Sequence, residues 1–388
     1  MEFLGEVDEV SQRLHAREGV PRDEMRVVVS PYRICPLGAH VDHQGGTVMG
    51  RAIAVHTVLA FAPLSTRTVW LSSVNFEGSV SFQIGDDPRS DWSRYAQAAA
   101  AALDQHTQLH YGLVGCVQGA LLGAGLSSSA SVTLAYLLAL ATVNGKELSP
   151  AELVELVRQV ENEYLGLNNG ILDQSSIVYS RTDAFVSLDT RTRQLTYVPD
   201  PPNVTDVCWL IAYSGFSREL LGSGFNRRVA ECREAARLLD PTATVLSDVS
   251  PSLFANKEAA LPPPLRRRAR HYFTEVARVT AGGKVWANGD WESFGRLMDR
   301  SCASSIEQYE CGSQPLIELH HIASHTDGVF GSRFSGGGYG GCLIALTARR
   351  EADVAAQQIL RAYLQRYPEK RGVAAAFLVS TEEGPRVI

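Results

Sequence analysis

The sequence predicts an α+β protein with two lobes. Its 388 residues exceed one domain of ordinary size, and 45% of them are hydrophobic, which is enough to build two cores. Segments typical of strands and of helices follow one another without strict βαβ alternation. A Pro-rich segment that begins at Asp200 separates them near the middle of the chain. We therefore expect one lobe over residues 1–199 and a second over residues 200–388.

Strand and helix signals are mixed through residues 1–199. Clusters of β-branched and aromatic residues predict strands at 25–34, 51–64, 68–84, 112–121 and 183–190. Strong helix formers predict a helix at 92–106, and a later apolar run predicts a helix that ends at Asn144 and Gly145. Ser149 and Pro150 are typical of the cap and first residue of the next helix.

Helices dominate the second half of the chain. Strands are predicted at 206–216 and at the end of the segment 328–347. Helical periodicity and composition predict four helices, at 226–239, 265–283, 291–305 and 351–367.

Composition and charge exclude several classes of function. The formal charge of -6 gives no net basic field, so we expect no nucleic-acid partner. The apolar run that begins at Ala130 is too short to span a bilayer, and residues 1–10 lack the pattern of a signal peptide. Seven scattered cysteines without a C-x-x-C pair are typical of reduced thiols. We expect a cytoplasmic protein without a membrane partner, and the sequence leaves the oligomeric state open.

The segment 123–131 (GAGLSSSAS) is typical of a phosphate-binding loop. Its glycines allow a sharp turn and close approach to a ligand, and three serines stand where a helix begins. A helix N-terminus binds an anion through free N–H groups without any basic side chain. The Walker pattern G-x-x-x-x-G-K-[ST] occurs nowhere in the chain. A serine-capped helix after a tight turn is the alternative for this segment taken alone.

A second glycine cluster and two carboxylates strengthen the case for a nucleotide site. Residues 334–341 (FSGGGYGG) have five glycines, which suit a backbone that must approach another group closely. A kinase needs a carboxylate for its metal and often a base for the attacking hydroxyl. Glu161, near the end of a predicted helix, and Asp173, after a glycine-containing turn, are the candidates.

Three motifs in order resemble those of the GHMP small-molecule kinases, and most closely the galactokinase branch. They are SPYRICPLGAHVDHQGG, LGAGLSSSAS and GSRFSGGGYGGC, which begin at residues 30, 122 and 331. The resemblance extends from about Arg26 to Thr347. It implies an N-terminal lobe like domain 2 of ribosomal protein S5, a ferredoxin-like C-terminal lobe, and an active site between them. It also implies ATP and Mg²⁺.

The resemblance implies a role for each matching position. Asp173 resembles the catalytic aspartate that accepts or orients the proton of the sugar C1 hydroxyl, and Arg33 resembles the arginine that neutralises charge between sugar and γ-phosphate. Ser129 and Glu161 resemble the Mg²⁺ ligands. The ATP-binding positions are Gly123, Ala124, Gly125, Leu126, Ser127, Ser128, Ser129 and Trp92. The active-site glycine loop is Gly336, Gly337 and Gly338. The sugar-binding positions are Ala39, His40, Asp42, His43, Gly170 and Phe225.

Position 39 departs from the galactokinase pattern, in which a glutamate binds the C6 hydroxyl of galactose. Ala39 lacks that carboxylate, while His40 and Asp42 are kept. If the sugar carries a carboxylate at C6, a glutamate at about 4 Å would repel it by about 4 kcal/mol at an effective dielectric of about 20, roughly a thousandfold in binding. The departure therefore resembles galacturonokinases, and D-galacturonic acid is the expected substrate. His43 is a candidate cation or donor for the carboxylate.

Two alternatives remain open at this stage. The chain could phosphorylate a neutral sugar such as galactose or arabinose, if Ala39 only loosens a galactokinase pocket, or an acid sugar other than galacturonate. Phe225 stands where the galactokinase pattern has a tyrosine near the sugar, and the lost hydroxyl leaves the exact sugar open. A protein of another class, a regulator that senses sugar and ATP without turnover, would be expected to lack some of the catalytic positions. Since these positions are all present, the sequence favours an enzyme.

Overall fold

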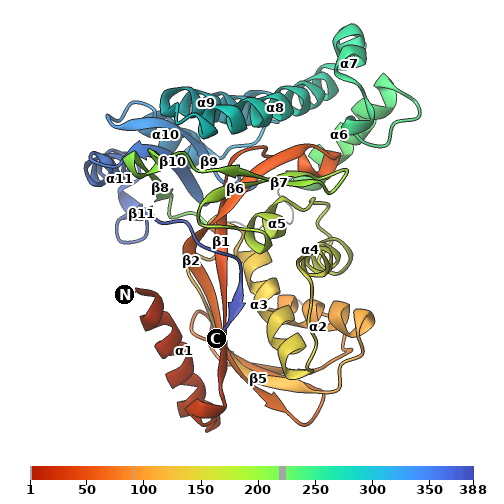
Figure 1. Cartoon of the computed structure of the whole chain (residues 1–388), viewed down its shortest axis with the longest axis vertical. Coiled ribbons are helices and arrows are strands. Elements are labelled where there is room, and N and C mark those ends of the chain that lie inside the picture. Colours follow the sequence, from red (N-terminus) through yellow and green to blue (C-terminus); the bar gives the residue numbers. More distant parts are fainter. Residues whose placement is uncertain (1, 90, 218–223) are drawn as a thin grey trace.

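The computed structural model describes residues 2–89, 91–217 and 224–388, which form two β-sheets covered by helices (Figure 1). The strands of the first sheet are β1 (Arg26–Leu37), β2 (Thr47–Leu64), β3 (Thr68–Ser73), β4 (Ser79–Gln83), β5 (Gly112–Gly119), β6 (Ala184–Asp189), β7 (Leu195–Pro199) and β12 (Arg386–Val387). Their order is β12-β1-β2-β5-β3-β4, with β6 beside β2 and β7 beside β6. All pairs are antiparallel except β3 with β5.

The second sheet is antiparallel and comes from the second half of the chain. Its strands are β8 (Val207–Tyr213), β9 (Val329–Phe334), β10 (Cys342–Ala348) and β11 (Ala375–Val379). Their order is β11-β8-β10-β9. The chain passes from the first sheet to the second between Pro199 and Val207, and its last strand returns to pair with β1. The α+β fold class predicted from the sequence is confirmed.

Helices cover both sheets and connect their strands. They are α1 (Glu2–Glu18), α2 (Arg94–His106), α3 (Ser128–Val143), α4 (Pro150–Gln159), α5 (Leu172–Val178), α6 (Phe225–Leu239), α7 (Pro251–Lys257), α8 (Pro263–Ala287), α9 (Trp291–Glu307), α10 (Gln314–Ala323) and α11 (Ala352–Arg366). In Figure 1, α1 lies on one side of β1, β2 and β5, and α2 and α3 lie on the other. The long pair α8 and α9 crosses the far end of the molecule.

One hydrophobic core joins the two sheets. Met49 and Phe185 from the first sheet share this cluster with Trp209 from the second and with Trp286 and Phe294 from α8 and α9. The ring of Phe185 meets that of Trp286 edge to face, with 4.8 Å between the ring centroids. Aromatic side chains bury large apolar areas, so this cluster fixes the two sheets relative to each other. Residues that extend from both sheets therefore keep a defined geometry between them.

Local signals predicted most of the strands and helices, and eight of these elements were not predicted. The cap at Ser149 is a full capping box, in which Glu152 reaches back to the Ser149 backbone. The elements without a prediction are α1, α5, α7, α10, β7, β9, β11 and β12. One of these elements, α5, is a helix of seven residues.

No helix in the described part of the chain is long and apolar enough to cross a membrane.

Candidate active site

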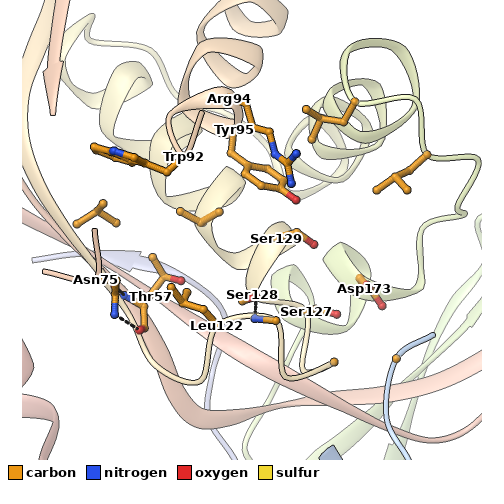
Figure 2. Close-up of a pocket in the computed structure, with 18 of the residues that line it drawn as sticks. Thr57, Asn75, Trp92, Arg94, Tyr95, Leu122, Ser127, Ser128, Ser129 and Asp173 are labelled. Carbon is orange, nitrogen blue, oxygen red and sulfur yellow. Dashed lines mark hydrogen bonds between the residues drawn. The ribbon is translucent and has the colours of Figure 1, made fainter. Parts of the chain in front are cut away.

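A cavity of about 440 Å³ opens between the two glycine-rich loops and the start of α2. Its lining includes the serines of the first loop, Asp173, and a group of residues from β3, the β3–β4 connection and the start of α2. Figure 2 shows Trp92 at one side of this cavity and Asp173 at the other, with Ser127, Ser128 and Ser129 between them. The cavity therefore brings together the residues predicted to contact the nucleotide base, the residues predicted to bind the phosphates, and the predicted catalytic residue Asp173.

The serine loop has the backbone shape that an anion site needs. Gly123, Gly125 and Ser127 all have positive φ, at 69°, 75° and 64°. Ser127 directly precedes α3, so the free N–H groups at the start of that helix face the loop. A left-handed serine is unfavourable, and the hydroxyl of Ser127 is buried without a partner among the described residues. Both features are what a loop built around a bound anion would show.

The two glycine loops pack backbone against backbone. A Cβ on Gly125 would lie 2.7 Å from the Ser335 carbonyl oxygen, and one on Gly336 would lie 2.8 Å from the Gly125 carbonyl oxygen. A Cβ on Gly341 would lie 2.2 Å from the Ala124 carbonyl oxygen. These positions tolerate only glycine, because real Cβ atoms do not approach carbonyl oxygens so closely. Much of the glycine content thus serves to dock one loop on the other, and Gly336, Gly337 and Gly338 also line the cavity.

Ala124 and Leu126 belong to the serine loop but face away from the cavity. Both side chains are fully buried in the core between the sheets. The Ala124 carbonyl accepts the N–H of Cys342, and the Leu126 carbonyl accepts the N–H of Arg33. They hold the loop in position rather than lining the cavity.

Arg33 connects Asp173, the predicted catalytic residue, to both glycine loops. From β1 its Nε and Nη2 donate to the same oxygen of Asp173, Oδ1, at 3.0 and 2.8 Å. Its Nη1 donates to the Gly125 carbonyl and to the Ser335 hydroxyl, at 3.1 and 2.9 Å. The Arg33 side chain is 2% exposed, whereas that of Asp173 is 25% exposed and lines the cavity. No donor in the described part of the chain contacts Asp173 Oδ2, so this oxygen is left for a ligand.

Glu161 lies beside the serine loop, in a turn of π-helix at the end of α4. This turn comprises Val160–Tyr164, and π-turns occur often at functional sites. Its Oε1 accepts from the Ser129 hydroxyl at 3.3 Å, and its Oε2 accepts from the Asn169 amide at 2.6 Å. Burial, and secondarily the charge of Asp173, raises the pKa of Glu161 to about 8.

A divalent cation would fit this group. The Ser129 hydroxyl and the Asn169 amide are neutral donors, so within the described part of the chain this buried acid has no cation among its hydrogen-bond partners. Carboxylate and hydroxyl oxygens are the ligands that Mg²⁺ prefers. The predicted pair of metal ligands, Ser129 and Glu161, is therefore in contact.

The predicted sugar-binding residues gather beyond Asp173, outside the lining of the cavity. Asp42 Oδ2 accepts the backbone N–H of Leu172 at 3.1 Å, which sets it next to the first turn of α5. A Cβ on Gly170 would lie 2.6 Å from Asp42, so this glycine is required by the packing. Burial, and then the nearby charge of Asp173, raises the pKa of Asp42 to about 6.

Ala39, His40, His43 and Phe225 form a buried group with residues that the sequence did not single out. The ring of His40 stacks on Tyr309 with 4.3 Å between centroids, and that of His43 meets Phe225 edge to face at 5.9 Å. The Ala39 carbonyl lies 3.0 Å from Nε2 of His271. Loop 39–44 therefore folds around the Tyr309 ring.

The histidines of this group are neutral, which excludes a role for His43 as a cation in this structure. Burial lowers the pKa of His43 to about 3 and that of His271 to about 4, and it lowers the pKa of His40 well below its usual value. His43 is thus a hydrogen-bond donor or acceptor in this structure and not the cation that the sequence left open.

Trp92 lines the cavity, as the sequence predicted, together with several residues that the sequence analysis did not identify. Trp92 precedes α2 and its ring stacks on Phe76 with 5.8 Å between centroids. Asn75, Arg94 and Tyr95 also line the cavity, and Figure 2 shows Arg94 and Tyr95 across it from Ser127 and Ser128. The helix-forming composition of 92–106 predicted α2, but it carried no sign that the first turn faces a ligand.

Comparison with known proteins gives one consistent group of relatives. The model of the GHMP kinases N terminal domain matches residues 94–181, and that of the GHMP kinases C terminal domain matches residues 284–366. A galacturonokinase from Arabidopsis thaliana is 40% identical over 94% of this chain and 93% of its own length. A galactokinase from Enterococcus faecalis is 32% identical over 92% of this chain and 94% of its own length.

A solved structure agrees with the sequence relatives. The galactokinase of Lactococcus lactis, crystallised with galactose, superimposes with a TM-score of 0.90 at 28% identity, over 97% of this chain and 98% of its own. Mevalonate kinases share the fold at lower similarity, with a TM-score of 0.62 and 16% identity for one of them.

Proposed function

Because the chain belongs to the GHMP kinase family, as an ATP-dependent sugar kinase of the galactokinase branch, we propose that it phosphorylates the anomeric hydroxyl of D-galacturonic acid. The products are galacturonic acid 1-phosphate and ADP. The observation that carries this choice is Ala39, an uncharged side chain in the sugar-binding signature. The identity of 40% to a galacturonokinase supports the same choice.

Asp173 and Arg33 carry out the phosphoryl transfer in this proposal. Asp173 Oδ2 accepts the proton of the C1 hydroxyl while the C1 oxygen forms a bond to the γ-phosphorus and the bond from phosphorus to the β-phosphate oxygen breaks. Arg33 orients the Asp173 carboxylate through two hydrogen bonds to Oδ1 and offsets negative charge near the transferred group. Positioning and charge neutralisation account for most of the rate in such reactions.

The serine loop and Glu161 complete the site. The N–H groups at the start of α3 bind the phosphates, and Ser129 and Glu161 would hold Mg²⁺. When bound, Mg²⁺ supplies charge neutralisation on the phosphate oxygens. The buried wall of the sugar site, with its neutral histidines, excludes water from the reacting hydroxyl.

ADP release in the presence of different sugars tests the proposal. We expect galacturonate to give the highest kcat/KM among galacturonate, glucuronate, galactose and arabinose. Galactose as the preferred substrate would contradict it and would agree with the likeness to galactokinases. No ADP release with any sugar, despite ATP binding, would favour a sensing protein instead.

The role of Ala39 is tested by two substitutions of equal size. Ala39→Glu should lower kcat/KM for galacturonate roughly a thousandfold, because it adds a like charge near the C6 carboxylate. Ala39→Gln adds almost the same volume to this buried position without charge, so it measures the steric part of the loss. An equal loss in both variants would refute the electrostatic argument.

A further inference from the structure

A chain of hydrogen bonds runs under the sugar-binding loop and ends at Tyr309. The backbone N–H of Leu246 donates to Gln44 Oε1 at 3.2 Å. Gln44 Nε2 lies 2.9 Å from His43 Nδ1, and His43 Nε2 lies 3.0 Å from the Tyr309 hydroxyl. All four residues are buried, with Tyr309 1% exposed. The proposed function uses none of Gln44, Leu246 or Tyr309.

The donation by the Leu246 N–H fixes the direction of every later hydrogen bond in this series. A backbone N–H only donates, so the Gln44 oxygen faces Leu246 and its NH₂ group faces His43. His43 Nδ1 is therefore the acceptor, and in the neutral ring the hydrogen is on Nε2. His43 must then donate to the Tyr309 oxygen.

This arrangement leaves the hydroxyl hydrogen of Tyr309 without an acceptor in the described part of the chain. Its oxygen already accepts from His43, and no other hydrogen bond of this hydroxyl is formed there. Buried hydroxyls are nearly always satisfied as donors, and leaving one unsatisfied is costly. An acceptor on a bound ligand would therefore complete the hydrogen bonding of this hydroxyl.

Tyr309 lies beside Ala39, the position that corresponds to the C6-binding glutamate of the galactokinase pattern. Its ring stacks on His40, the residue after Ala39, and lies 5.2 Å from the ring of His271, which contacts the Ala39 carbonyl. Burial, and then neighbouring thiols, Tyr339 and Asp42, raise the pKa of Tyr309 well above its ordinary value, so the hydroxyl keeps its hydrogen. The Ala39 side chain offers this hydroxyl no acceptor.

We propose that Tyr309 recognises the acid group of the substrate, by donating its hydroxyl hydrogen to the C6 carboxylate. His43 and Gln44 are positioning residues that orient this donor. The inference rests on the proposed function, and it replaces a cation with a directed neutral donor. Hydrogen bonds to a carboxylate are stronger than those between neutral groups, which favours an acid sugar over a neutral one.

Tyr309→Phe tests the donor directly. The KM for galacturonate should rise about ten- to hundredfold, while kcat and the KM for ATP stay nearly unchanged. With galactose the change should be less than about tenfold, because its C6 hydroxyl accepts a weaker bond. Tyr197→Phe is the matched control. It removes a hydroxyl in β7 that donates to the Tyr179 carbonyl and takes no part in the proposed sugar site. An unchanged KM for galacturonate in Tyr309→Phe would overturn the inference.

Gln44→Met tests the positioning role. Without the amide, His43 can take either tautomer, and only the fraction with hydrogen on Nε2 orients Tyr309 correctly. If the two tautomers are equally populated, the KM for galacturonate should rise about twofold at constant kcat. A loss in kcat with a raised KM for ATP would mean that Gln44 has only a structural role. It would contradict the proposal that Gln44 orients Tyr309 through His43.

The wild-type enzyme separates this inference from the function on which it rests. Turnover of galacturonate by the wild type, with no effect of Tyr309→Phe on its KM, overturns the role of Tyr309 and leaves the proposed function standing. Turnover of galactose without turnover of galacturonate overturns both.

Discussion

At the scale of single residues, the geometry of one ion pair decides which carboxylate oxygen is available for chemistry. Both bonds from Arg33 to Asp173 go to Oδ1, and Oδ2 has no donor in the described part of the chain. The pair spans 140 positions of sequence, and it also ties Asp173 to the serine loop through the bond from Arg33 to Gly125. An acid at another position of α5 would lack this orientation.

Asp173→Asn should abolish most turnover without loss of nucleotide binding. The amide oxygen can still accept from Arg33, which leaves an NH₂ group, a donor, facing the C1 hydroxyl. We expect kcat to fall about a thousandfold, in the range for loss of a general base. Calorimetric titration with ATP should give the wild-type affinity, and Asp183→Asn, at an exposed position, serves as the control. Normal turnover by folded Asp173→Asn would refute the assignment.

Asp42 predicts the pH dependence of sugar binding. Its pKa is raised to about 6, mainly by burial, so it is ionised at pH 7 and largely protonated at pH 5. The ionised form accepts hydrogen bonds from sugar hydroxyls, so the sugar KM should rise about tenfold per pH unit below pH 6. Steady-state kinetics from pH 5 to 8 measures this. Asp42→Asn should give a high KM that no longer changes with pH, whereas a sloping profile in that variant would assign the titration elsewhere.

We predict that Arg94 contributes to the affinity for ATP, because the serine loop itself supplies no cation. The serine loop has no lysine, and Arg94 lines the cavity across from Ser127 and Ser128 (Figure 2). Arg94→Ala should therefore raise the KM for ATP about tenfold with little change in kcat. Arg94→Lys keeps the charge and should recover most of the affinity. Equal KM values for wild type and Arg94→Ala would show that this side chain does not contact the phosphates.

At the scale of elements, the contact between the two glycine loops is the most sensitive junction. Gly341 has a φ of 99°, and a Cβ there would overlap the Ala124 carbonyl. Gly341→Ala should lower the free energy of unfolding by about 3 kcal/mol, from backbone strain and separation of the loops, and it should raise the KM for ATP.

Gly283→Ala is the matched control for that substitution. Gly283 lies inside α8, and an added Cβ would meet only Val198 at an ordinary 3.5 Å. Alanine is the better helix former, so this variant should be more stable by up to about 1 kcal/mol. Urea denaturation of both variants checks the pair. Similar stabilities would mean that the loops can move apart without cost.

The elements that local sequence predicted are those with a local cause. The capping box at Ser149 and the glycine-to-serine entry into α3 are written in a few adjacent residues. Helix α5 has seven residues and no side-chain cap, so it has no such signal and is stabilised by packing against β1 and β2. The same limit applies to the site. Arg33, Asp173, Ser129 and Glu161 are found through motifs, whereas Tyr309 acquires its place only through the fold.

At the scale of the whole molecule, the site exists because the two sheets are fixed to each other. Arg33 extends from β1 of the first sheet, and Ser335 and the glycine loop follow β9 of the second. The shared core around Phe185 and Trp286 keeps these two parts of the site at a fixed separation. No periodicity in the sequence indicates which strands will be neighbours across the two sheets, so this junction was not predictable from local patterns.

The last strand, β12, makes a prediction at this scale. Val387 pairs with Val28 of β1, and Ile388 exchanges two backbone hydrogen bonds with Val27. The chain end therefore protects the edge of the first sheet, far from the cavity. Deletion of residues 384–388 removes these bonds and exposes the edge, so it should lower the free energy of unfolding by on the order of 2–4 kcal/mol.

The kinetic constants of the folded truncated enzyme should stay near those of the wild type, because β12 contributes no residue to the cavity. Saturating ATP should recover part of the lost stability, since a ligand that binds only the folded state stabilises it by mass action. Urea denaturation with and without ATP, followed by an ADP-release assay, measures both effects. A truncated protein with wild-type stability would show that β12 is dispensable, and one with intact stability but raised KM values would connect the chain end to the active site, against the geometry of the first sheet.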